Sequence, residues 1–226
     1  MTDHLDSRAL RNTDSYGQRF MRPGTYRYAL GPAGTGGFLQ EYPYVISVGE
    51  GEPKRGEMAQ TTVLVRREGR TYVPDQPKIS INAGDMVMWH SPEAAARPFV
   101  VAGEKDFFSS ERLVNESGYT HAFTSEGVYE WEDAHGSGTR GLIRVGNPDV
   151  SSAKGQRAWA RAQRKGTVVM VTDGQAEPAE VDVVVGQTVF FAVVNGPGIS
   201  ITDRSLLAHD GHRKGAAFHR NATRTT

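Results

Sequence analysis

The sequence predicts an all-β protein made of two β-sandwich domains. Short runs of β-branched and aromatic residues alternate with turn signals along most of the chain, a pattern typical of sandwiches and barrels. Glycine is abundant, with 26 residues among 226. This length is enough for one large β domain or for two domains of about 100 residues each.

An internal repeat supports the division into two domains. Residues 16–28 (YGQRFMRPGTYRY) align without a gap with residues 119–131 (YTHAFTSEGVYEW). One copy therefore serves as a control for the other, because shared residues are expected to serve the fold. Reactive side chains that occur in one copy alone are candidates for function. In the central copy these are His121, Asp133 and His135, where the other copy has Gln18, Leu30 and Pro32.

The individual elements follow from the same pattern. Each expected strand combines β-branched or aromatic residues with flanking turn residues. Residues 151–164 are expected to form a helix capped by Asp149 or Ser151, with an apolar stripe that contains Trp159 and with cations near its C-terminal end. The expected strands are residues 63–66, 78–82, 86–90, 99–102, 119–123, 128–132, 141–145, 168–172, 181–185 and 189–194.

A second correspondence predicts how the strands group. Residues 78–89 and 182–191 both read as a strand, a glycine turn and a strand. The segment 61–147 thus contains an early and a late half, and we expect it to form one continuous domain. Each flanking segment contains one half only and would expose strand edges alone. We expect residues 15–50 and 166–208 to complete each other as a circularly permuted domain, or in trans as a domain-swapped homodimer. Residues 149–165 would be a linker helix and residues 209–226 a flexible tail.

The order of motifs in residues 61–147 resembles the cupredoxins, the Greek-key β-sandwich family of plastocyanin and the azurins. The flanking halves resemble the same family more loosely. The resemblance implies two cupredoxin-like domains, one of them permuted. It is carried by the Gly84-Asp85 turn before Trp89, by Phe107-Phe108-Ser109, by Tyr119 and Phe123, by Gly127-x-Tyr129-x-Trp131, and by His135 before a glycine-rich loop.

The resemblance also implies a blue copper site with two His, one Cys and one Met, but three of these ligands are absent. Phe99 stands at the first histidine position, Asp133 at the cysteine position and Arg140 near the methionine position. His135 matches the second histidine. A blue copper centre needs a thiolate, and the chain has no cysteine. Blue-copper electron transfer is therefore excluded.

Strand alternation predicts which side chains replace that centre. His121 and Asp133 should point into the sandwich, and His135 begins the loop at the same end. Two imidazoles and one carboxylate suit non-thiolate copper, iron, manganese or zinc, with copper the most plausible. Glu132 should face outward. His90 lies at the same end on the opposite face and ranks second as a metal ligand.

Three functions remain open at this stage. The leading hypothesis is a small-molecule enzyme with one non-blue metal ion, in which Arg140 or Glu132 places the substrate. The alternative has no metal: Asp133 orients a histidine for acid–base work, or the pocket only binds a ligand, while Arg140 holds an anionic group. The third is a non-catalytic scaffold that binds a partner.

The composition narrows the partners and the compartment. The net charge is zero, which predicts no nucleic-acid partner, although a neutral total does not exclude a local basic patch. The absence of cysteine excludes disulfides and thiolate nucleophiles. No apolar run is long enough for a membrane span, and the polar N-terminus predicts a cytoplasmic protein. His209, His212 and His219 in the tail form a weaker candidate metal site.

Overall fold

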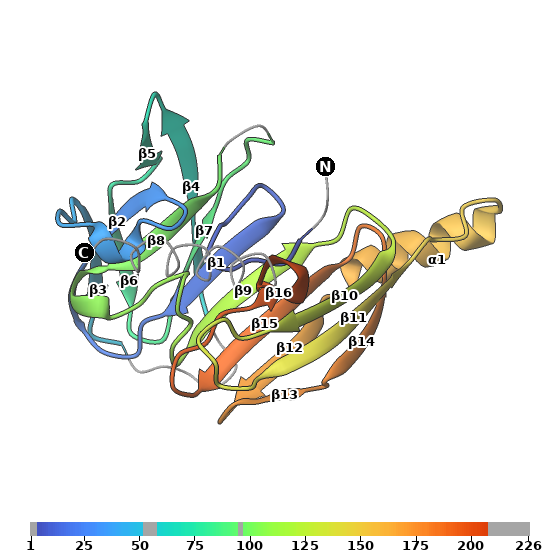
Figure 1. The fold of residues 1–226 in the computed structure, drawn as a ribbon. Helices are drawn as coiled ribbons and strands as arrows, with labels where there is room; N and C mark the ends of the chain where they lie inside the picture. The colour runs from blue at the N-terminus through green and yellow to red at the C-terminus, as the bar shows by residue number, and fades with distance from the viewer. Residues whose placement is uncertain (1–3, 52–57, 95–96, 208–226) are drawn as a thin grey trace, which may run out of the picture.

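The structure is a computed structural model that describes residues 4–51, 58–94 and 97–207, and strands predominate in it (Figure 1). Apart from the strands it contains the helix α1 (Ala153–Arg164) and the short 3-10 helices η1 (Gly36–Phe38) and η2 (Glu104–Asp106). The predicted tail histidines lie outside the described residues. The strands are β1 (Asp14–Arg19), β2 (Gly24–Pro32), β3 (Tyr44–Gly49), β4 (Gln60–Glu68), β5 (Thr71–Pro74), β6 (Lys78–Asn82), β7 (Met86–His90), β8 (Phe99–Gly103), β9 (Ser117–Ala122), β10 (Gly127–Glu132), β11 (Arg140–Gly146), β12 (Thr167–Thr172), β13 (Gln175–Glu177), β14 (Glu180–Val184), β15 (Thr188–Asn195) and β16 (Thr202–Asp203).

The strands form three sheets whose order is symmetric about the middle of the largest. The eight-stranded sheet runs β13-β12-β15-β9-β1-β7-β4-β5, and the four-stranded sheets run β14-β11-β10-β16 and β6-β3-β2-β8. At the centre of the large sheet β1 and β9 pair antiparallel, with Tyr16 opposite Tyr119. These two tyrosines are equivalent in the sequence repeat. A pseudo-two-fold axis therefore passes through this pair and relates the two halves of the molecule.

The pairing differs from the grouping expected from the sequence. Strands β4 to β8 complete sheets with β1 to β3, and strands β12 to β16 complete sheets with β9 to β11. The strands of residues 61–147 are therefore divided between the two halves, and in the described part of the chain no ladder joins residues 15–50 to residues 166–208. The sequence did not distinguish the two groupings, because the repeat allows each late half to pair either with the early half before it or with the early half after it. In the structure each late half pairs with the early half that follows it, through the parallel ladders β3–β6 and β11–β14.

Aromatic side chains fill the space between the sheets in the same way in both halves. Tyr28 of β2 meets Trp89 of β7 edge-on, with ring centroids 5.3 Å apart. The equivalent pair in the other half, Trp131 of β10 and Phe191 of β15, also meets edge-on at 5.2 Å. All four side chains are buried. Such pairs add about 0.5–1.5 kcal/mol beyond the burial of their area. The shared aromatic positions of the repeat thus serve the core.

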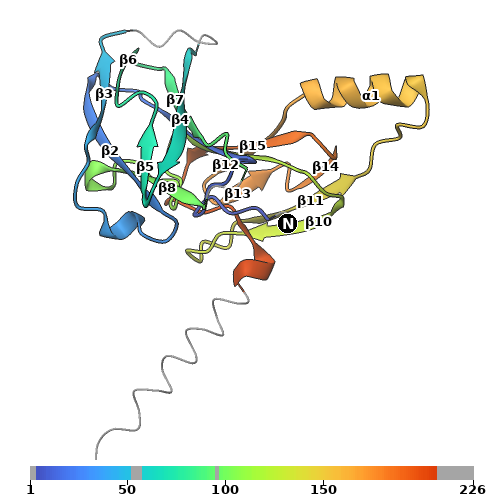
Figure 2. The same cartoon turned by 90° about the horizontal axis from the view of Figure 1, so that it is seen from above.

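Helix α1 lies at the opposite end of the molecule from β3 (Figures 1 and 2). Its N-cap is Ser152, whose hydroxyl accepts a hydrogen bond from the Gly155 amide at 3.0 Å. This is one residue beyond the expected cap. Trp159 and Ala162 are partly buried against the body of the protein. Among the described residues, no helix has the length and apolar character that crossing a membrane requires.

Candidate functional site

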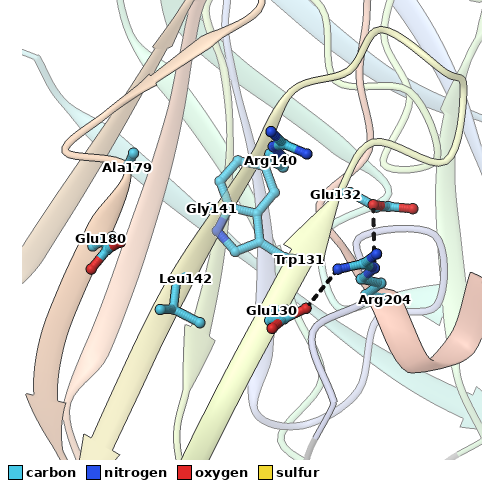
Figure 3. A pocket seen from close by; sticks show the side chains of 9 residues that line it. All are labelled: Glu130, Trp131, Glu132, Arg140, Gly141, Leu142, Ala179, Glu180 and Arg204. Carbon is cyan, nitrogen blue, oxygen red and sulfur yellow. Dashed lines mark hydrogen bonds and ion pairs between the residues drawn. The ribbon is translucent and has the colours of Figure 1, made fainter.

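Two of the predicted site residues, Arg140 and Glu132, lie together in a pocket on the outer face of the β14-β11-β10-β16 sheet (Figure 3). Its volume is about 310 Å³, within the range of roughly 300–1,000 Å³ typical of small-molecule sites. Side chains from β10 and β11 and from the start of β14 surround it. The lining residues are Glu130, Trp131, Glu132, Arg140, Gly141, Leu142, Ala179, Glu180 and Arg204.

Gly141 of β11 lies at the pocket and packs closely against the neighbouring strands. Gly141 pairs with Trp131 across the β10–β11 ladder. A Cβ atom at position 141 would lie 2.7 Å from the indole Nε1 of Trp131 and 2.8 Å from the carbonyl oxygen of Ala179. Both separations are shorter than side chains allow. Glycine at position 141 therefore leaves room for the indole of Trp131, which is buried.

The charges around the pocket are unequally paired. The Arg204 guanidinium donates to Glu130 at 2.9 Å and lies 3.9 Å from Glu132. Glu180 is bound by Arg144 at 2.7 Å. Arg140 stands opposite Glu132 in the β10–β11 ladder, yet it forms no ion pair with any described residue. Figure 3 shows why: the Glu132 carboxylate turns toward Arg204. The pocket therefore presents the Arg140 guanidinium without an ion-pair partner among the described residues.

His121 lies elsewhere, in a buried network centred on Asp14. Its Nδ1 is 2.7 Å from Oδ1 of Asp14, and the Tyr119 hydroxyl donates to the same oxygen at 2.7 Å. Asp14 and His121 are each 1% exposed. Burial, followed by the negative charge of Asp14, raises the pKa of Tyr119 well above its usual value. The carboxylate beside His121 is thus Asp14, rather than the expected Asp133.

The other copy of the repeat has an equivalent contact. There the Tyr16 hydroxyl donates to Oε1 of Gln18 at 3.1 Å, and Gln18 is equivalent to His121. In both halves the side chain at this position therefore lies beside the hydroxyl of the tyrosine two residues before it: Gln18 accepts a hydrogen bond from Tyr16, and His121 Nδ1 is 3.4 Å from the Tyr119 hydroxyl. Sequence reasoning missed Asp14, which stands opposite His121 in the β1–β9 ladder. Its role could be predicted only if the pairing of β1 with β9 were already known.

Asp133 holds the loop that follows β10. Its Oδ1 accepts hydrogen bonds from the amides of Ser200 at 2.8 Å and His135 at 3.0 Å, and its Oδ2 accepts from the amide of Ser137 at 2.9 Å. Burial alone would raise the pKa of Asp133, but these amide donors together hold it below its usual range. Asp133 is thus an acceptor for backbone amides.

The remaining predicted ligands are also separated. His135 is exposed, and its Nε2 lies 2.9 Å from the carbonyl oxygen of Glu111. The Nδ1 of His90 lies 3.1 Å from the carbonyl oxygen of Asp14. Within the ranges that the structure describes, no three His, Asp or Glu side chains come together as a metal-binding group. The expected convergence of His121, Asp133 and His135 is therefore not found.

No protein-family model matches this chain, and no curated protein or solved structure matches it either. The resemblance to the cupredoxins accordingly stays a prediction from the order of sequence motifs. The pocket around Arg140 has to be interpreted from its own chemistry.

Proposed function

We propose that this protein binds a small molecule with an anionic group, and that the ligand occupies the pocket between β10, β11 and β14. The observation that carries the proposal is the guanidinium of Arg140, which has no ion-pair partner in the described part of the chain and lies beside a hollow of about 310 Å³. Arginine presents planar, paired N–H donors that match a carboxylate or phosphate. The partly exposed side chain of Leu142 supplies apolar surface for the rest of the ligand.

The repeat supports a specific role for this pocket. The residues equivalent to Glu130, Trp131 and Glu132 in the other half are Arg27, Tyr28 and Ala29. The middle position is aromatic in both halves, because Trp131 and Tyr28 both fill the core. The two carboxylates that organise Arg204 occur in one half only. The charge pattern of the pocket is therefore not needed for the fold.

An acid–base enzyme is the second candidate at the same place. Within the described residues, the ion-pair contact of Glu132 is a guanidinium nitrogen 3.9 Å away, and its side chain is 38% exposed, so its carboxylate is accessible to a ligand bound at Arg140. The metal-dependent enzyme predicted from His121, Asp133 and His135 has no such support, because each of these side chains bonds to other groups. That hypothesis keeps its own test, metal analysis of the purified protein.

The proposed scaffold is a pair of cupredoxin-like units, each in circularly permuted strand order. Two features support it: in each half the strands of the late motif precede those of the early motif, and the parallel pairs β3–β6 and β11–β14 occupy equivalent positions. This arrangement replaces the expected insertion of one domain into the other by two units in tandem.

Ligand titrations monitored by NMR test the proposal. Benzoate, inorganic phosphate and glycine serve as probes of a planar carboxylate, a phosphate and a zwitterion. We expect at least one probe to shift the Gly141 amide and the Trp131 indole signals saturably, and Arg140→Gln to abolish these shifts. Arg27→Gln is the matched control, because Arg27 is an exposed arginine of the other half. Unchanged shifts in Arg140→Gln, or no response to any probe, would refute the proposal.

A further inference from the structure

The outer face of α1 carries a continuous stripe of positive charge. At 100° per residue, its five cations fall within an arc of about 100° and extend over about 16 Å of the helix. All five are exposed. They are Lys154, Arg157, Arg161 and Arg164 of α1, together with the C-cap residue Lys165.

No acidic side chain of the described residues neutralises this stripe. The chain contains no Asp or Glu between Asp149 and Asp173. None of the five cations forms an ion pair with a residue in the described ranges, and the one side-chain hydrogen bond among them joins Arg161 Nε to the Arg157 carbonyl oxygen at 3.3 Å. Like charges one helical turn apart repel each other by a few tenths of a kcal/mol. A polyanion bound along the helix would remove this repulsion.

Contacts on the inner side fix the orientation of the stripe. The indole Nε1 of Trp159 donates to the carbonyl oxygen of Val185 at 2.8 Å. The Gln187 side chain donates to the carbonyl oxygen of Ala162 at 2.9 Å. The side of α1 that carries Trp159 thus faces the body of the protein, and the exposed basic side faces away from it. The helix itself lies at one end of the molecule (Figure 2). This surface has no lining residue in common with the Arg140 pocket.

The residues beside the stripe discriminate between possible partners. The exposed positions between the cations and the inner face are Ala153, Gln156, Ala158, Ala160 and Gln163. An interfacial membrane helix needs large apolar side chains on its outward face, and none is present there. A protein interface normally needs a buried aromatic or aliphatic anchor, which is also absent. The chemistry that remains is positive charge, and three of the five cations are arginines, whose guanidinium geometry matches a phosphate.

We infer that α1 binds the phosphate backbone of duplex nucleic acid without reading its sequence. The neutral net charge of the chain concealed this surface, because the excess of cations is confined to one short segment. Each phosphate contact releases counterions, so that affinity depends on salt. If three to five of the cations contact phosphates, the affinity should fall about 40- to 500-fold between 50 and 200 mM salt.

The test is fluorescence anisotropy of the full chain with labelled 20-base-pair DNA and RNA duplexes of mixed sequence. The helix variant replaces four outward cations by glutamine, which keeps good helix propensity. The control variant makes the same change of charge at four exposed positions elsewhere. The helix variant is Lys154→Gln, Arg157→Gln, Arg161→Gln and Arg164→Gln, and the control variant is Arg27→Gln, Arg66→Gln, Arg70→Gln and Lys78→Gln.

We expect the helix variant to bind at least ten-fold more weakly than the wild type at 50 mM salt and to lose most of the salt dependence. The control variant should bind like the wild type. A preference for DNA would place α1 in the major groove, which is wide enough for a helix in B-form DNA alone, whereas equal binding to RNA would place it on the backbone. No binding to either duplex, equal losses in both variants, or tighter binding to phosphatidylserine vesicles than to DNA would overturn the inference.

Discussion

Replacing Asp14 by alanine should destabilise the protein by about 2–6 kcal/mol, because two buried donors would lose their acceptor. The Tyr119 hydroxyl and the His121 ring each contact Asp14 Oδ1 at 2.7 Å, and each buried donor left without a partner costs about 1–3 kcal/mol. The Arg11 amide, 2.8 Å from Asp14 Oδ2, adds a smaller loss because water can reach it. Small domains have total stabilities of about 5–15 kcal/mol, so a folded variant remains measurable.

Equilibrium unfolding in urea at pH 7 measures this loss. Asp182→Ala is the control, because its side chain is 81% exposed and its nearest cation is 3.8 Å away. Such a surface pair contributes little, so we expect a change within about 0.5 kcal/mol. Asp14→Asn keeps one oxygen as an acceptor and should lose less than the alanine variant. If Asp14→Ala unfolds within about 0.5 kcal/mol of the wild type, the buried network does not support the fold as described.

Three further predictions concern the predicted metal ligands. His121→Gln should keep the fold to within about 1 kcal/mol, because Gln18 occupies the equivalent position in the other half, whereas His121→Ala leaves buried partners unpaired and should cost more. Elemental analysis of untagged protein checks the metal hypothesis with the same variant: about one metal per chain in the wild type and none in His121→Gln would support it, and no metal in either would refute it. The pKa of Asp133 is lower in the folded than in the unfolded chain, so its contribution to stability is fully present above the unfolded value of about 3.9 and is lost as pH falls through the folded value. The difference in unfolding free energy between wild type and Asp133→Asn should therefore shrink between pH 6 and pH 3, and a constant difference would contradict the assigned role.

The sequence alone determined the local structure well. The expected strands at residues 78–82 and 86–90 coincide with β6 and β7, and the helix begins within two residues of its predicted start. These features depend on side-chain alternation, turn residues and capping, which act over a few neighbouring residues. The repeat also predicted that Trp131 and Tyr28 would occupy equivalent core positions. Strand alternation placed Glu132 on the outer face, where the pocket lies.

Only the tertiary structure decided which halves of the repeat pair. Both groupings bury equivalent aromatic faces, and local patterns carry no information about which strand from a distant segment becomes the neighbour. The pairing of β1 with β9 then decided the site. It brought Asp14 to His121 and left Asp133 to bind backbone amides. It is also the tertiary structure that shows the Arg140 guanidinium without an ion pair to any residue it describes, since the alternation of strands specifies a face but not the direction of a long side chain on it.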